Sequence, residues 1–297
     1  MFIEIFFVPQ KVVGDTFGYE FLSNLAGKSL GKFNANIIID FQECTFFDGN
    51  LCAVLGNILQ SLKDRNNTIQ IINLSGKVRG AMGRNGFLTN FVSNINVPVI
   101  YHNSIPYRKF KLEDESHAKD FFKDQLFGKQ DMPHMSPLAQ KEIIRNIFEV
   151  CLNAVTHGGC EYVYCCGQVY LRKVPAKALI TFADLGNSIK ANVNNYLRKN
   201  LTGNEAIMWA LADGNTTKTQ DIPGGLGLKL LQNLIYLNKG KLQFVSGDGF
   251  VEIKDGNPTF FKLDIDFPGT IVTLELLLND PNFYYLGDED KEWTNIF

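Results

Sequence analysis

Residues 142–159 read EIIRNIFEVCLNAVTHGG, and their apolar side chains recur at intervals of three to four positions. This spacing predicts an α-helix with one buried stripe. Ser136-Pro137 is a suitable start for the helix, and Gly158-Gly159 is a suitable end. Glu149 and Asn153 are one turn apart, so they share a face of the helix. A carboxylate and a carboxamide on such a helix indicate either a polar site or a solvent-facing edge.

Three stretches further along the chain carry glycine turns beside apolar segments. Residues 179–189, LITFADLGNSI, predict a strand that ends in Asp184 and a tight turn. Residues 223–231, PGGLGLKLL, predict a glycine cluster that opens a helix, where exposed backbone amides suit a phosphate. Residues 267–278, FPGTIVTLELLL, predict a turn followed by an alternating strand, with Thr270 at the start of that strand.

Taken in order, these four stretches resemble the sequence boxes of the GHKL ATPases, the family of gyrase-type, heat-shock-chaperone-type, histidine-kinase and mismatch-repair ATPases. The matching residues are Glu149, Asn153, Ala154 and His157 in the first box, Asp184 and Gly186 in the second, Gly225, Gly227 and Leu228 in the third, and Gly269, Thr270 and Leu274 in the last. The second glycine of the family's D-x-G-x-G box is missing, because Ser188 stands there. The resemblance covers roughly residues 107–297 and implies a Bergerat-fold α/β sandwich that binds ATP.

The chemistry of ATP agrees with the roles that this resemblance implies. A carboxylate such as Asp184 can accept a hydrogen bond from the exocyclic amine of adenine, with Thr270 as a second polar contact. Mg²⁺ keeps several waters and takes few protein oxygens, so the Asn153 carboxamide suffices as its ligand. Glu149, one turn earlier, can act as the general base that takes a nucleophile's proton.

The remaining candidate residues are placed on the phosphate side of the predicted site. The backbone amides of Gly225 and Gly227 can approach the phosphates. Lys218, in a polar loop where the family has its mobile lid, either reaches a phosphate or is only solvated. His157 either serves the phosphates or is a structural histidine. The ATP-binding residues expected from the boxes are therefore Asn153, His157, Asp184, Gly186, Lys218, Gly225, Gly227, Leu228 and Thr270.

The first hundred residues alternate strand and helix patterns. Apolar runs predict strands in residues 1–10, 36–41 and 69–74, and a helix in residues 50–63. This rhythm is typical of an open sheet with helices packed on it. Residues 73–91 are punctuated by glycines and carry Lys77, Arg79 and Arg84, and they are expected to form a solvated connection, with a phosphate- or nucleic-acid-binding loop as the alternative.

Residues 37–87 resemble the STAS family, the fold of anti-sigma-factor antagonists. The resemblance is carried by IIIDFQECTFFD, the helix LCAVLGNILQSLK and the strand IQIINLSGKV. In those antagonists the Asp is followed by serines, one of which accepts phosphate, whereas Asp48 is followed by Gly49 and Asn50. We therefore expect a fixed partner domain, a docking surface or a dimerisation surface rather than a phosphoryl acceptor. The expected fold is α/β with two domains, residues 1–106 and 107–297.

The composition of the chain disfavours two classes of function, nucleic-acid binding and membrane insertion. The chain has 297 residues, of which 45% are apolar and 20% charged, and its net charge is 29 minus 31, or -2. Bulk charge therefore disfavours a nucleic-acid partner. No apolar run approaches 18 residues, which predicts no membrane span. Six cysteines scattered through apolar segments suit a cytoplasmic protein with reduced thiols.

Three functions are consistent with an ATP site beside a STAS-like domain. The first is a signal-transduction kinase that phosphorylates a serine or threonine of a partner protein, as the resemblance to anti-sigma-factor kinases implies. The second is an ATP-hydrolysing conformational switch, in which Glu149 activates water. The third is a binding module in which ATP and Mg²⁺ create a partner surface without turnover. The sequence leaves these functions open, and it leaves the choice between a monomer and a homodimer open.

Overall fold

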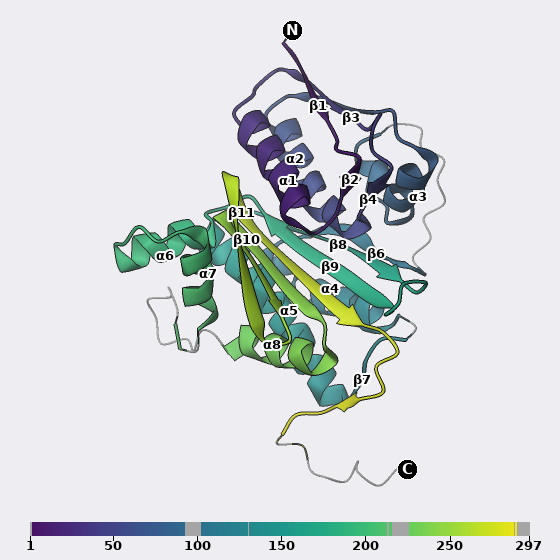
Figure 1. Cartoon of the computed structure of the whole chain (residues 1–297), viewed down its shortest axis with the longest axis vertical. Coiled ribbons are helices and arrows are strands. Elements are labelled where there is room, and N and C mark those ends of the chain that lie inside the picture. The colour runs from purple at the N-terminus through teal and green to yellow at the C-terminus, as the bar shows by residue number, and fades with distance from the viewer. Residues whose placement is uncertain are drawn as a thin grey trace.

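The computed structural model describes residues 2–92, 102–129, 131–212, 214–215, 226–287 and 289, without the side chains of residues 112, 150–158 and 226–228. The fold is mixed α/β, as predicted: helices pack against both faces of a five-stranded sheet, and a three-stranded parallel sheet lies toward the N-terminus (Figure 1). Within the described ranges, none of the helices combines the length and apolar character needed to cross a bilayer.

The central sheet is antiparallel throughout and has the strand order β10-β11-β9-β8-β6. Its strands are β6 (Ser104–Phe110), β8 (Val163–Tyr170), β9 (Lys177–Asp184), β10 (Lys241–Lys254) and β11 (Asn257–Leu277). All but one residue of β8 and all but one of β9 are buried. An antiparallel strand with one solvated face would alternate, so this pattern shows that the middle of the sheet is covered on both sides.

The long strand β10 folds back on itself. The Glu252 carboxylate accepts a hydrogen bond from the Gln243 side chain at 2.8 Å and pairs with Lys241 at 3.0 Å. Eleven residues of extended strand would separate Lys241 from Glu252 by roughly 35 Å. The reversal falls at the bulge between Ser246 and Gly249, where Gly247 has a φ of 58°.

One face of the central sheet is covered by three helices: α4 (Glu115–Phe122), α5 (Pro137–Gly158) and α8 (Leu226–Asn238). The start of α5 agrees with its sequence signal, because the Ser136 hydroxyl accepts a hydrogen bond from the Ala139 backbone at 3.0 Å. Its end agrees as well, since Gly159 has a φ of 64°. The apolar stripe of α5, with Ile143, Ile147 and Phe148, is buried in this core.

The N-terminal layer is a β-α-β-α-β unit, as its sequence rhythm predicts. Its strands β1 (Ile3–Phe7), β3 (Asn36–Asp40) and β5 (Thr68–Ile72) are parallel neighbours in that order. Helices α1 (Thr16–Ser29) and α2 (Cys52–Asp64) connect them. Both crossovers step in the same direction across the sheet, and right-handed crossovers of that kind place both helices on one face.

The expectation of a plain connection in residues 73–91 is wrong, because helix α3 (Gly76–Arg84) lies there. Ser75 caps it by accepting a hydrogen bond from the Val78 backbone, and Val78 and Met82 are buried. The other short elements are β2 (Lys11–Val12), β4 (Phe46–Phe47), η1 (Gly49–Leu51), η2 (Leu88–Asn90), η3 (Leu112–Asp114), η4 (Lys123–Phe127), β7 (His134–Met135), α6 (Ile189–Leu197), α7 (Gly203–Leu211) and β12 (Phe283–Tyr284).

A buried polar network joins the N-terminal layer to the second face of the central sheet. The Asn50 amide donates to the Thr181 hydroxyl at 2.7 Å, and Thr181 lies 2.8 Å from the Thr273 hydroxyl across the β9–β11 pair. The Tyr19 hydroxyl lies 3.2 Å from Thr273 and donates to the Gln243 side chain at 2.9 Å. Each of these side chains has a hydrogen-bond partner in the network, although the Asn50 side-chain oxygen has none, and the contacts between the layers favour one register.

We expect Tyr19→Phe to lower the free energy of unfolding by about 1–2 kcal/mol, because it leaves buried groups without their hydrogen-bond partner. The aromatic contact with Phe250, at 4.9 Å between ring centroids, remains in this variant. Urea denaturation measures the change. The matched control is Tyr236→Phe on an exposed side chain of α8. Equal stabilities for the two variants would show that the network contributes nothing measurable.

Candidate functional site

Asp184, Gly186 and Thr270 meet where β9 ends. Asp184 is the last residue of β9 and stands opposite Thr270 of β11. Its carboxylate is 2% exposed and accepts a hydrogen bond from the Gly186 backbone at 2.9 Å. The D-x-G turn therefore holds the carboxylate from its own chain, while β11 brings Thr270 beside it.

The electrostatics of Asp184 are unusual for an aspartate. Burial raises the pKa of its carboxyl to about 7, against the opposing effect of backbone hydrogen bonds from Gly186 and Thr270. Near neutral pH the group therefore lies close to its midpoint. A ligand that donates a hydrogen bond to the carboxylate would favour the charged form. Buried groups with pKa values displaced toward neutrality are frequent at functional sites.

Gly269 allows the strands to approach closely beside Asp184. Its φ is 155°, and a Cβ atom added there would lie 2.1 Å from the Asp184 carbonyl oxygen. No side chain fits in that space. The glycine before Thr270 is thus required by the β9–β11 pairing itself, independently of any ligand.

The C-terminal end of α5 lies near the same strand end. Burial raises the pKa of the Cys160 thiol to about 12, and the negative charge of the nearby Asp184 carboxylate adds to that increase. Cys160 follows α5 by two residues, so the helix end is close to Asp184. Glu149, nine residues before that end, is half-buried on α5. Nine residues of helix correspond to roughly 13 Å along the axis.

The other predicted site residues fall on α5, on α8 or outside the described residues. Asn153 and His157 lie on α5, where the structure describes the backbone alone. Gly227 and Leu228 lie in the first turn of α8, which begins at Leu226 within the glycine-rich stretch predicted to open a helix and packs against α5. Gly225 and Lys218 lie outside the described residues.

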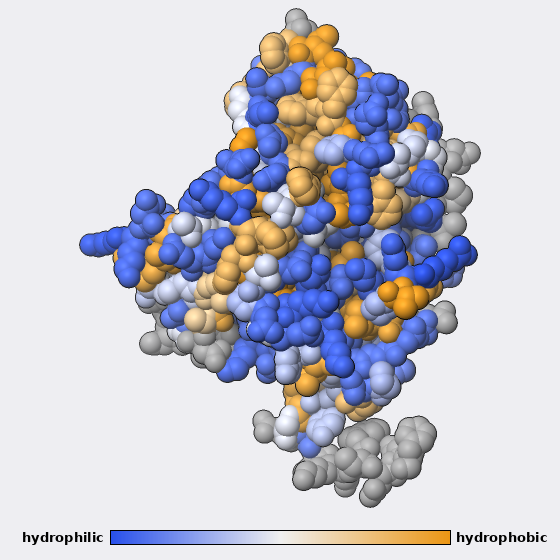
Figure 2. All heavy atoms as spheres, in the orientation of Figure 1, coloured by the Kyte–Doolittle hydropathy of each residue, from blue (hydrophilic) through white to orange (hydrophobic). Residues whose placement is uncertain are grey.

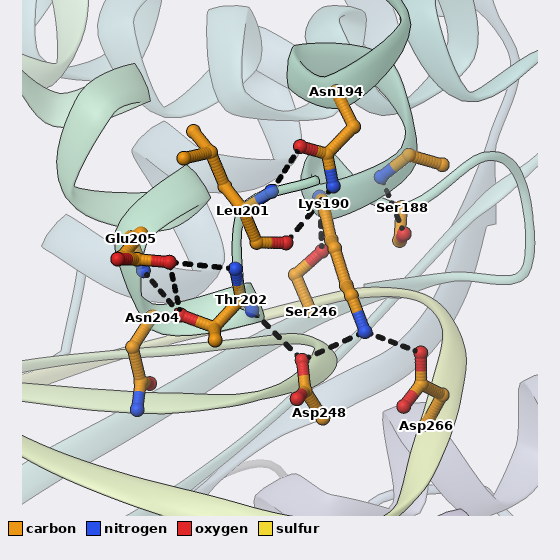
Figure 3. Close-up of polar contacts among 12 residues, drawn as sticks. Ser188, Lys190, Asn194, Leu201, Thr202, Asn204, Glu205, Ser246, Asp248 and Asp266 are labelled. Atoms are coloured by element: carbon orange, nitrogen blue, oxygen red, sulfur yellow. Dashed lines mark hydrogen bonds and ion pairs between the residues drawn. The ribbon is translucent and has the colours of Figure 1, made fainter. Parts of the chain in front are cut away.

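A second polar cluster fixes the two helices that follow the D-x-G turn (Figure 3). The Lys190 ammonium on α6 bonds to Asp248 at 2.9 Å and to Asp266 at 3.0 Å. Asp248, at the bend of β10, also accepts a hydrogen bond from the Gly203 backbone at 2.7 Å. Thr202 and Glu205 cap α7 reciprocally. The first turns of α6 and α7 are therefore held on the β10–β11 region.

Sequence reasoning missed this cluster and the interface network. For Lys190 no local signal exists, since its two carboxylate partners lie 58 and 76 residues away. For the interface network a signal was present: Thr181 and Thr273 are polar residues inside apolar strands. Among the described residues, no group of three or more His, Cys, Asp or Glu side chains could hold a metal ion.

Comparison with known proteins adds no assignment: no protein-family model matches the chain, and no curated protein matches it.

We expect the stability difference between wild type and Asp184→Asn to depend on pH. Because the folded-state pKa of Asp184 is raised from 3.8 to about 7, the folded protein retains a proton that the unfolded chain releases. Wild type should therefore lose up to ~4 kcal/mol relative to the variant as pH rises from 4 to 8. Urea denaturation across this range measures it. The control is Asp255→Asn at the exposed tip of the β10–β11 hairpin. If the stability difference for Asp184→Asn changed no more steeply with pH than the difference for Asp255→Asn, the result would contradict the burial of a charge at Asp184.

Lys190→Met should destabilise the protein by ~1–2 kcal/mol at low salt, because it leaves two carboxylates without the cation between them. Methionine keeps the apolar stem, so the comparison isolates the charge. The effect should shrink in 1 M NaCl, whereas Lys199→Met, on an exposed side chain, should change little at either salt concentration. Thermal unfolding at two salt concentrations checks this, and a salt-independent loss would point to packing instead.

Proposed function

We propose that this chain is an ATP- and Mg²⁺-binding regulatory protein with a Bergerat-type nucleotide site. In this proposal it transfers the γ-phosphate to a serine or threonine of a partner protein, or uses the bound nucleotide to gate that partner's binding. The observation that carries the proposal is Asp184: a carboxylate 2% exposed at a strand end, bonded to the Gly186 backbone and adjacent to Thr270. Three residues from two of the four sequence boxes thereby meet at one place.

Some of the site residues would contact the adenine, and the others would contact the phosphates and Mg²⁺. Asp184 would accept the adenine amine, and Thr270 would add a second polar contact. The first turn of α8 offers backbone amides to the phosphates, whose negative charge suits a helix N-terminus. Asn153 would hold Mg²⁺, which neutralises phosphate charge when bound. Glu149 would accept the proton of the attacking hydroxyl.

The packing around Asp48 argues against a phosphoryl acceptor in this turn of the N-terminal layer and supports an acceptor elsewhere. Asp48 is 7% exposed and accepts a hydrogen bond from the Tyr170 hydroxyl on β8. A Cβ atom added at Gly49 would lie 2.5 Å from the Gln168 side chain, and the Asn50 side chain bonds to Thr181. The positions where STAS antagonists carry serines are thus packed against the central sheet. A hydroxyl on another protein is the better candidate for the acceptor.

The alternative function is a nucleotide-gated switch, with or without hydrolysis. It is favoured by the position of the interface network. Thr181 and Thr273 lie three residues from Asp184 and Thr270, on the same two strands. A nucleotide that shifts the ends of β9 and β11 would act on the hydrogen bonds to Asn50 and Tyr19 through rigid strands. ATP could in this way change the N-terminal layer without any covalent transfer.

We expect Asp184→Asn to weaken ATP binding about 10- to 150-fold, because it removes a charged hydrogen-bond partner worth ~1.5–3 kcal/mol. Wild-type affinity should also fall below pH 7, where the carboxyl of Asp184 takes up its proton, and the variant should lack this pH dependence. Isothermal titration calorimetry from pH 6 to 8 measures both effects. ATP binding as tight in Asp184→Asn as in wild type would place the adenine elsewhere.

Glu149→Gln should retain ATP binding and lose chemistry, since the carboxamide keeps the shape of the side chain but cannot accept the proton. The assay follows γ-labelled ATP with Mg²⁺, measuring free phosphate and protein-bound label separately, with and without cell extract. Label on a protein of the extract supports the kinase, and free phosphate alone supports the hydrolysing switch. Binding with neither product leaves the non-catalytic switch, while undiminished turnover in Glu149→Gln would exclude Glu149 as the base.

A further inference from the structure

The three-stranded sheet of the N-terminal layer is covered by helices on one face only. Its other face carries Ile3, Ile5 and Phe7 of β1, which are 58%, 47% and 65% exposed. Apolar side chains gather at this upper end of the molecule, over the part labelled β1 and α1 in Figure 1 (Figure 2). All-parallel sheets are normally buried on both faces. No element among the described residues covers this one.

β1 is also the free edge of this sheet. The backbone of Phe2 and that of Val8 each bond to the β3 side at 2.8 Å. Alternate residues of a parallel strand direct both backbone groups to the same neighbour. The even-numbered residues therefore face β3, and Ile3, Ile5 and Phe7 direct their N–H and C=O groups to the open edge. An apolar edge strand with unpaired backbone groups is a surface that invites a second strand.

We propose that β1 pairs antiparallel with β1 of a second copy of this chain, about a two-fold axis perpendicular to the sheet. With the axis at Ile5, Ile5 stands opposite its own copy and Ile3 opposite Phe7, so all three edge-facing residues form hydrogen-bonded pairs. Glu4 then stands opposite Phe6. Moving the register by one residue toward the N-terminus would oppose Glu4 to its copy, a like-charge contact that destabilises a sheet. The strand is thus self-complementary in one register, as a two-fold interface requires.

The neighbouring surface of α1 would also take part in this interface. A groove of about 430 Å³ runs between β1 and α1, with walls that include Phe6, Phe17 and Phe21. Glu20 and Lys28, which also line it, are placed symmetrically about Asn24 in the sequence. The axis sets α1 antiparallel to its copy, and with Asn24 level with the axis Glu20 of one chain would face Lys28 of the other. This charge complementarity argues for a second copy rather than an unrelated strand as the occupant.

Light scattering coupled to size exclusion tests the pairing without nucleotide, so its outcome is independent of the proposed function. Wild type at tens of micromolar should show twice the chain mass of 33.4 kDa. Ile5→Lys sets two ammonium groups against each other at the axis and should give the mass of a single chain. Val174→Lys, at a side chain 99% exposed elsewhere on the surface, should remain a dimer. Circular dichroism and urea denaturation establish whether each variant is folded.

Ile5→Cys provides a second test that does not depend on disrupting the interface. Hydrogen-bonded antiparallel pairs have Cα atoms about 5.5 Å apart, within reach of a disulfide. Diamide, which takes up the two electrons and two protons that the thiols lose, should link the Ile5→Cys chains at least tenfold faster than Val174→Cys chains. Wild type treated alike gives the background from native thiols. A monomeric wild type, or a dimer that Ile5→Lys leaves intact and Ile5→Cys does not link, would overturn the proposal.

Discussion

The hydrogen bond between Thr181 and Thr273 is the point on which the arrangement of layers depends. The two hydroxyls face each other across the β9–β11 pair, 2.8 Å apart, in a sheet whose middle strands are buried on both sides. Without partners from the N-terminal layer the two hydroxyls would be polar groups on an apolar surface, and each unsatisfied group would cost about 1–3 kcal/mol. Asn50 and Tyr19 remove that cost only when the N-terminal layer sits in one position. Apolar packing supplies most of the attraction between the layers, and these groups select the register.

The same two strands carry the candidate nucleotide contacts. Asp184 and Thr270 form the pair at the end of β9, and Thr181 and Thr273 form the pair three residues further in. Beside the outer pair, Gly269 leaves no room for a side chain, so the strands are held close at that point. A change at the strand ends therefore cannot be absorbed locally by a soft loop. The geometry provides a short, stiff connection between the proposed site and the N-terminal layer.

Much of the fold could be predicted from the sequence because its signals are local. The stripe of α5 follows the helical period, Ser136 and Gly159 mark its ends, and the apolar runs of the first hundred residues predict the parallel strands. Helix α3 was missed because glycines at positions 76, 80 and 83 lower helix propensity, whereas the Ser75 cap and the burial of Val78 and Met82 outweigh that preference. The reversal of β10 was missed although its Ser-Gly-Asp-Gly stretch is a turn signal.

The candidate site could likewise be predicted only in part, because some of its features depend on residues that are close in sequence and others depend on the complete fold. The spacing within each box is local, and it identified Asp184, Gly186 and Thr270, which the fold brings together. The environment of Asp184 is not local: its displaced pKa arises from burial in the fold, and β11, which pairs with it, lies more than 80 residues further along the chain. That burial has a chemical consequence for the choice of ligand. The ionised carboxylate accepts a hydrogen bond from a donor such as an exocyclic amine more strongly than the neutral carboxyl does, so binding of the proposed ligand would be coupled to proton release at pH values below about 7. Recognition by Asp184 would therefore be strongest when the pH is above 7, and weaker in any environment more acidic than that.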